Sequence, residues 1–133
     1  MKESQFWALV KDKLLGDVER VENALTRGTP DVNGCFESNE YWLELKVLDD
    51  KGRCELRPEQ TLWHRRRQEN GGRVFVLARN DNVLKLYQVQ RNMEMFEIWQ
   101  CTKPFEWNSM NQLIFTVPPF CTELQVIYRG EVQ

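Results

Sequence analysis

The chain of 133 residues contains 41% hydrophobic and 29% charged residues, which is typical of one folded domain and excludes a disordered segment. Its apolar runs are much shorter than the ~20 residues that a membrane helix needs, and the first residues lack the apolar part of a secretory signal. We therefore expect a cytoplasmic protein without a membrane partner, folded as a single domain over residues 1–133.

The net charge of −2 is unevenly distributed along the chain. Residues 1–50 carry 6 basic and 11 acidic side chains, residues 51–79 carry 8 and 3, and residues 80–133 carry 4 and 6. A basic middle segment beside an acidic first third suits a protein that binds phosphates with cations and a metal with carboxylates. The basic segment is equally compatible with a solvent-exposed helix face.

The four cysteines lie far apart and form no CxxC pair: Cys35, Cys54, Cys101 and Cys121. This spacing does not favour a zinc site, and a reducing compartment does not favour disulfides. We expect mostly buried thiols.

Periodic apolar residues predict a first helix over residues 3–15, which ends at Gly16. Residues 18–25 are compatible with a short strand or with a continuation of that helix. After a turn at Gly28-Thr29-Pro30, two strands are predicted over residues 31–37 and 41–48, joined by a tight turn at Ser38-Asn39.

A loop at residues 49–52 precedes a second helix from Pro58 to about Glu69, with Gly71 beyond its end. The apolar run 73–78 predicts a strand, and a helix between two strands implies that they are parallel. Residues 83–89 predict a further strand. Residues 93–99 are compatible with a helix or a strand, and residues 113–117 and 124–128 are expected to form short strands.

The order α-β-β-α-β-β predicts an α/β fold in which helices flank a mixed β-sheet. Residues 3–90 form the expected core. Residues 91–133 form a C-terminal extension without a chemical signal, which we attribute to packing, dimer contact or substrate contact.

Two charged residues stand out on the strand at 41–48. Residues two apart on a strand share a face, so Glu44 and Lys46 should point to the same side while the leucines between and before them point to the core. A turn at Ser38-Asn39 would place Asp31 opposite Lys46 on that face, although a longer turn or a bulge would change this register. Two carboxylates and a lysine are then expected to converge.

Such a group of side chains suits phosphodiester hydrolysis. Asp31 and Glu44 can bind Mg²⁺ or Mn²⁺ through carboxylate oxygens, and the backbone carbonyl of Leu45 is placed to reach the same ion. The ion would polarise the phosphate and activate a water. Lys46 would orient that water or balance the charge of the transition state.

Four segments resemble the PD-(D/E)XK nucleases, and in particular their VRR-NUC branch: residues 28–31 (GTPD), 42–46 (WLELK), 56–60 (LRPEQ) and 71–76 (GGRVFV). Pro30-Asp31 corresponds to the "PD" and Glu44-Leu45-Lys46 to the "ExK" of the motif. The branch includes small phage-encoded proteins and relatives of Holliday-junction resolvases. The resemblance covers residues 3–79.

The resemblance implies a restriction-endonuclease-like fold, a homodimer, and the host cytoplasm as location if the chain is phage-encoded. It also implies that Gln60, at the start of the helix after the ExK strand, helps to order the site. A glutamate of the first helix would assist the metal through water. Glu3 fits this role best, with Glu19 and Glu22 as alternatives.

The candidate DNA contacts are five arginines, each equally compatible with a solvated surface role: Arg57, Arg65, Arg66, Arg67 and Arg73. His64 is the only histidine and is expected at the surface, which leaves no histidine pair for catalysis. The glycines form no phosphate-binding motif, so we expect no nucleotide cofactor.

The leading hypothesis is a divalent-metal-dependent DNA endonuclease, and its preference for junctions or other branched DNA is left open. One alternative is a non-catalytic nucleic-acid-binding module that keeps a nuclease fold. Another is a structural or protein-interaction domain in which the motif is accidental. Metal binding would separate the first hypothesis from the other two.

Overall fold

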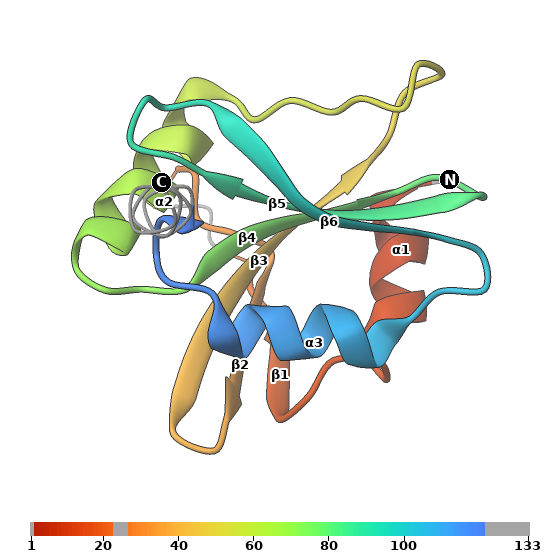
Figure 1. Ribbon diagram of the computed structural model, residues 1–133, viewed down its shortest axis with the longest axis horizontal. Coiled ribbons are helices and arrows are strands. Elements are labelled where there is room, and N and C mark those ends of the chain that lie inside the picture. The colour runs from red at the N-terminus through yellow and green to blue at the C-terminus, as the bar shows by residue number, and fades with distance from the viewer. Residues whose placement is uncertain (1, 23–26, 122–133) are drawn as a thin grey trace, which may run out of the picture.

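A computed structural model describes residues 2–22 and 27–121 of the chain (Figure 1). In order, the elements are α1 (Glu3–Val10), β1 (Asp17–Arg20), β2 (Val32–Phe36), β3 (Asn39–Val47), α2 (Pro58–Glu69), β4 (Val74–Arg79), β5 (Val83–Val89), β6 (Met95–Thr102) and α3 (Trp107–Thr116). The fold is therefore α/β, as predicted. No helix in these ranges combines the length and apolar character of a membrane span.

The strands form one mixed sheet in which neighbours in space are also neighbours in sequence, β1-β2-β3-β4-β5-β6. Strands β1 to β3 are antiparallel, β3 and β4 are parallel, and β4 to β6 are again antiparallel. The parallel pair predicted around the second helix is confirmed. It requires α2 to carry the chain from the end of β3 back to the start of β4.

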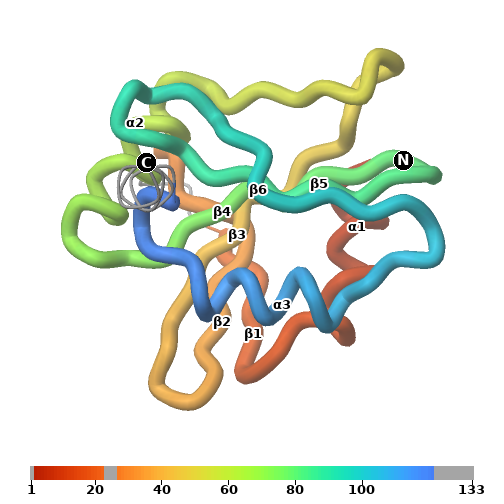
Figure 2. Tube along the Cα trace, viewed as in Figure 1, coloured from red at the N-terminus to blue at the C-terminus, as the bar shows by residue number. Residues whose placement is uncertain are grey.

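The helices cover both faces of the sheet. In Figures 1 and 2, α1 and α3 lie together below the sheet, and α2 lies beyond its upper face at the left. Phe6 and Val10 of α1 and Met110 and Ile114 of α3 belong to one buried apolar cluster with the lower face of the sheet. On the other face, the Trp63 ring of α2 lies 5.1 Å from the Trp42 ring of β3.

The first helix is shorter than predicted. It ends at Val10 instead of residue 15, and the chain turns so that Leu14 is buried while the Leu15 carbonyl accepts the Tyr41 hydroxyl at 2.9 Å. Gly16 then has a φ of +93°, and a Cβ there would lie 2.2 Å from the Cys35 carbonyl oxygen. The turn at Gly16 leads into β1, so residues 17–20 form a strand. Residues 23–25 of the predicted segment 18–25 lie outside the described residues.

The turn between β2 and β3 lies one residue earlier than predicted. Phe36 pairs with Asn39, so the two turn residues are Glu37 and Ser38, whose φ values are 49° and 70°. Positive φ at both positions is typical of a primed hairpin turn. Each β2 residue therefore faces a partner two positions from the predicted one, and the predicted pairing of Asp31 with Lys46 is wrong. A shift by two residues keeps every side chain on its predicted face.

For the second half of the chain, the structure confirms one predicted strand, decides one ambiguous segment and contradicts one predicted strand. Residues 83–89 form β5 as predicted, and the ambiguous segment 93–99 lies in strand β6 except for its first two residues. Residues 113–117 were predicted as a strand but belong largely to helix α3. Residues 124–128 lie outside the described residues. Since β6 extends the sheet and α3 covers its lower face, residues 95–116 are integral to the fold.

The prediction of mostly buried thiols is wrong. Cys35 is exposed, Cys54 and Cys101 are half-buried, and Cys121 alone of the four is buried; all four are free thiols. Cys35 lies on strand β2 opposite Glu40, and both side chains lie on the upper face of the sheet and are exposed.

Candidate active site

The site is built on strand β3. Tyr41, Leu43 and Leu45 are fully or almost fully buried in the cluster below the sheet. Because side chains alternate along a strand, Glu44 and Lys46 lie on the upper face, which α2 covers. Glu44 is only 3% exposed, and Lys46 is half-buried.

Asp31 reaches this strand from the residue before β2. Its backbone carbonyl accepts the Val21 N–H at 2.6 Å, which continues the pairing with β1. Its side-chain Oδ2 accepts the Leu45 N–H at 3.0 Å. At the start of β2, the Asp31 side chain thus takes the place of a backbone acceptor for β3. A residue on a strand directs its N–H and C=O groups to the same side, so the Leu45 carbonyl also lies on the Asp31 side of β3.

Gln60 connects the two upper-face residues of β3. Its Nε2 donates to Glu44 Oε1 at 3.2 Å, and its Oε1 accepts from Lys46 Nζ at 3.2 Å. The same Oε1 accepts the Arg57 N–H at 2.8 Å, which caps the first turn of α2. Gln60 is 4% exposed, so its amide has one position that satisfies the helix start and both site residues.

The loop before Asp31 packs against the start of α2. Gly28 has a φ of +87°, and a Cβ there would lie 2.2 Å from the Glu59 carbonyl oxygen. Only glycine allows this approach without a shift of the backbone. The contact brings the loop that leads to Asp31 beside the helix turn that carries Gln60. The four predicted residues Asp31, Glu44, Lys46 and Gln60 are therefore brought together from three parts of the chain.

The Glu44 carboxyl group has an unusual protonation equilibrium. Its pKa is raised to about 10, first by burial and then by the hydrogen bond to the Asp31 carboxylate and the charge of Asp31, while the charge of Lys46 opposes the increase. Glu3 also contributes to the increase from the first turn of α1. A buried carboxyl group that keeps its proton beside a second carboxylate is a place where a cation can replace that proton.

The oxygen atoms of this site fit a hard divalent cation. Asp31 and Glu44 provide carboxylates, and the Leu45 carbonyl lies on the same side of the strand. Mg²⁺ is bound by one or two carboxylates and keeps several waters, so it does not require more acidic groups. Within residues 2–22 and 27–121, no group of three or more His, Cys, Asp or Glu side chains could hold an ion by itself. Glu3, Glu19 and Glu22 are exposed, and of these only Glu3 is among the charges that shift Glu44.

Two of the predicted arginine contacts are engaged within the protein. The Arg73 guanidinium donates to the carbonyls of Ile114 and Val117 at 3.2 and 2.7 Å, at the end of α3. Arg65 forms an ion pair with Glu69 and donates to the Arg91 carbonyl. These contacts hold distant segments of the chain together.

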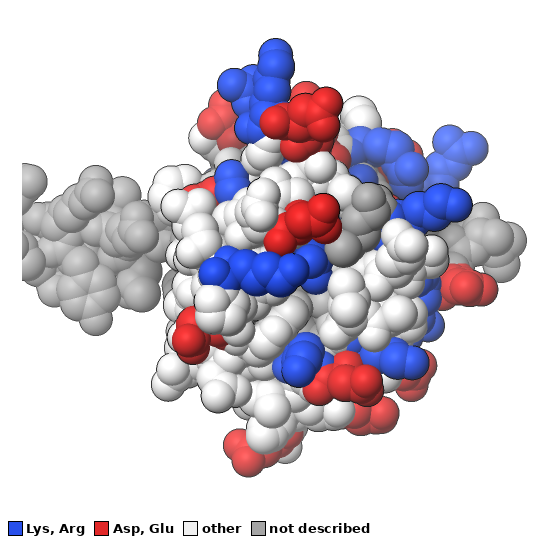
Figure 3. Space-filling model, turned by 90° about the vertical axis from the view of Figure 1, so that its right-hand side faces the viewer, with Lys and Arg blue, Asp and Glu red and all other residues white. Residues whose placement is uncertain are grey.

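The other three arginines are exposed. Arg57 precedes α2 and forms an ion pair with Glu59 at 3.1 Å. Arg67 lies over the rings of Trp63 and Trp42, 4.6 and 5.4 Å from their centroids. Figure 3 shows the side of the molecule away from α2, and there basic and acidic side chains alternate in small groups.

The histidine was placed wrongly. His64 was expected at the surface but is fully buried between α2 and the sheet, one helical turn after Gln60. Burial lowers its pKa to about 3, and the charge of Lys46 contributes. Among the described residues, the buried side-chain atoms without a hydrogen-bond partner are both His64 ring nitrogens and Gln68 Oε1. The stripe Gln60, His64 and Gln68 at intervals of four residues was the sequence signal that these polar groups share one face of the helix.

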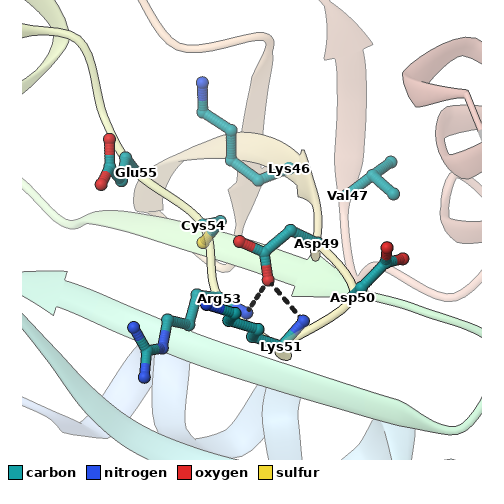
Figure 4. Close-up of a pocket in the computed structure, with 8 residues that line it drawn as sticks. All are labelled: Lys46, Val47, Asp49, Asp50, Lys51, Arg53, Cys54 and Glu55. Carbon is teal, nitrogen blue, oxygen red and sulfur yellow. Dashed lines mark hydrogen bonds between the residues drawn. The ribbon is translucent and has the colours of Figure 1, made fainter.

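A cavity of about 700 Å³ adjoins the site at Lys46. Its walls come from Lys46 and Val47 at the end of β3 and from the loop residues Asp49, Asp50, Lys51, Arg53, Cys54 and Glu55. We call it the loop cavity (Figure 4). The sequence indicated a loop at residues 49–52 but no role for it, because a turn signal does not reveal what the loop encloses.

Comparisons of the chain with models of protein families and with curated protein sequences find no match.

Proposed function

We propose that the protein is a divalent-metal-dependent DNA endonuclease of the PD-(D/E)XK type with a restriction-endonuclease-like fold. One observation carries the proposal: Asp31, Glu44, Lys46 and Gln60 converge on the upper face of the sheet through mutual hydrogen bonds. A buried carboxyl group, a lysine and a second carboxylate on one sheet face are costly for folding alone. Such a folding cost is expected where the side chains form a functional site.

Each side chain has a role that its contacts support. Asp31 and Glu44 hold the cation, together with the Leu45 carbonyl. A bound Mg²⁺ or Mn²⁺ supplies Lewis-acid activation of the phosphate and lowers the pKa of a coordinated water. Lys46 has no lone pair to offer while charged, so its ammonium group positions the attacking water or stabilises charge on the phosphate. Gln60 holds Lys46 and Glu44 at a constant separation, and Glu3 assists from α1.

Cleavage and metal binding test the proposal together. The protein is incubated with supercoiled plasmid and with a panel of single-stranded, flapped and branched DNA in Mg²⁺, Mn²⁺ or EDTA. We expect cleavage in either metal and none in EDTA. Asp31→Asn and Glu44→Gln should abolish both cleavage and the heat of Mn²⁺ binding in calorimetry. Asp17→Asn, which removes an exposed carboxylate from β1, is the matched control and should behave as wild type.

The outcomes separate the alternatives. Absence of cleavage on all substrates together with absence of metal binding refutes the proposal. DNA binding without metal-dependent cleavage would instead support a non-catalytic binding module. The expected homodimer is checked separately by sedimentation velocity, since cleavage of both strands does not by itself require it.

A further inference from the structure

The loop cavity lies next to the catalytic lysine but is not used by the proposed reaction. In Figure 4, Lys46 extends from the end of β3 on one side of the cavity, and Cys54 and Glu55 lie on the returning loop on the other side. On its other side, Lys46 Nζ contacts Gln60. Lys46 is therefore shared between the cavity and the site, and a group bound in the cavity would be adjacent to the phosphate that the site holds.

The loop has a defined shape. Asp49 Oδ1 accepts the backbone N–H groups of Lys51 and Arg53, each at 2.9 Å. The Gly52 carbonyl accepts from Lys85 Nζ of β5 at 3.1 Å. The first contacts are those of an Asx-type turn, and the last ties the loop to the sheet. Figure 2 shows the resulting path, in which the chain between β3 and α2 runs far above the sheet before it returns. The cavity is thus preformed.

Its lining combines three cations and three carboxylates with one apolar side chain and one thiol. Lys46, Lys51 and Arg53 provide donors, and Val47 provides an apolar surface. Burial raises the pKa of the Cys54 thiol to about 11, so this wall is uncharged at neutral pH. Lys51 and Arg53 are exposed, and in the described parts of the chain no hydrogen bond or ion pair engages either side chain. Asp49, Asp50 and Glu55 balance the charge of the three cations, which favours a ligand with both polar edges and an apolar face over a bare anion.

We propose that the loop cavity receives a single unpaired nucleotide next to the scissile phosphate, so that the preferred substrates are single strands, flaps and frayed ends. This inference rests on the proposed nuclease function and deepens it. The volume of about 700 Å³ lies within the range of small-ligand pockets, roughly 300–1,000 Å³, which suits a nucleotide and not a duplex. A base within a duplex must leave its stack and its partner to enter such a pocket, and this cost is smallest for a base that is already unpaired.

The chemistry of the lining agrees with a nucleotide. Lys51 and Arg53 can donate to the phosphate and to acceptors on the base edge. Val47 and the neutral Cys54 can contact the face of the base. Because the backbone N–H groups of residues 51 and 53, and not their side chains, hold the loop to Asp49, both side chains can be shortened without loss of the loop.

The test compares a double variant with a matched control. Lys51→Ala with Arg53→Ala removes two cations from the cavity, and Lys11→Ala with Lys13→Ala removes two exposed cations that follow α1. Cleavage of a single strand, a flap and a blunt duplex of the same sequence is measured in Mg²⁺. We expect wild type and control to cut the unpaired substrates at least about tenfold faster than the duplex. The cavity variant should lose most of that preference while its duplex cleavage changes by less than about threefold.

A binding measurement separates failure of this inference from failure of the nuclease proposal. Fluorescence anisotropy in EDTA compares labelled single strand and duplex for the same three proteins. Equal cleavage of paired and unpaired DNA, or an unchanged preference in the cavity variant, overturns the inference while the nuclease function stands. If no DNA is cut in Mg²⁺ or Mn²⁺, the nuclease function fails. In that case the binding data decide whether the cavity is a nucleotide site. The double variant should weaken single-strand binding by at least about tenfold, and unchanged binding would overturn the inference as well.

Discussion

Replacement of Glu44 by glutamine tests the electrostatics of the site without DNA. The carboxyl group is 3% exposed, and burial together with Asp31 raises its pKa to about 10 from its ordinary value of 4.5. Between these values the folded metal-free protein holds a proton that the unfolded chain has released. The stabilisation associated with Glu44 is therefore fully present below pH 4.5 and is lost as the pH rises toward 10.

The size of the effect follows from proton linkage. Each pH unit in this window lowers the free energy of unfolding by up to about 1.4 kcal/mol. Burial lowers the pKa of His64 to about 3 and raises that of Cys54 to about 11, so these groups act mainly below pH 6.5 and above pH 9. Between about pH 7 and pH 9, wild type should lose roughly 2–3 kcal/mol because of Glu44 alone.

Glu44→Gln should abolish this dependence. The amide keeps the shape of the side chain and can still accept from Gln60, but it has no proton to release. We expect a nearly constant free energy of unfolding between about pH 7 and 9, and a variant more stable than wild type at the upper end. Urea unfolding in EDTA, followed by tryptophan fluorescence, measures it. Glu40→Gln, on the same strand but exposed, should retain the wild-type slope. Parallel slopes for Glu44→Gln and wild type would refute the reasoning.

Three further predictions concern other residues. Lys46→Ala should keep Mn²⁺ binding in calorimetry but slow single-turnover cleavage by about a hundred- to a thousand-fold. Lys46→Arg should restore little of the rate, because a guanidinium cannot place a point charge identically. A loss of only a few-fold in Lys46→Ala would make Lys46 a structural counter-ion. His64→Leu should stabilise the protein at pH 5 by roughly 2 kcal/mol, since the depressed pKa of His64 costs stability as the pH falls from 6.5 toward 3; equal urea midpoints at pH 5 would contradict this. Arg73→Ala should destabilise the fold by about 1–3 kcal/mol, because two carbonyls at the end of α3 lose their donor; weaker DNA binding at unchanged thermal stability would instead favour a DNA contact.

Local sequence signals were sufficient to predict the strand and the helix that carry most of the site residues. The alternation of leucines with Glu44 and Lys46 indicated the strand and its two faces. Pro58 and Gly71 marked the start and end of α2, and a helix between two strands implied the parallel pair. These features depend on residues close in the chain, where periodicity and backbone preferences decide the structure.

The hairpin turn shows why the register was missed. Both Glu37-Ser38 and Ser38-Asn39 can form a two-residue turn, so the local sequence does not choose between them. Packing does: Gly34 pairs with Tyr41, and a Cβ at Gly34 would lie 2.2 Å from the Tyr41 ring. The ring can lie across β2 only where the strand has no side chain. Residues 113–117 were missed for a related reason, because a short apolar run does not show that Met110 and Ile114 face the same core as α1.

The sequence alone indicated which residues are candidates for catalysis and which of them share a strand or begin a helix. The tertiary structure decided how they meet: Asp31 ends beside Leu45 and Glu44, Gln60 bridges Glu44 and Lys46, and burial changes the protonation of Glu44. It also places Arg73 at the end of α3 and forms an open cavity beside the loop after β3. Hydrogen-bond partners, desolvation and the space between segments all depend on residues distant in the chain, whereas strand faces and helix starts depend on neighbours.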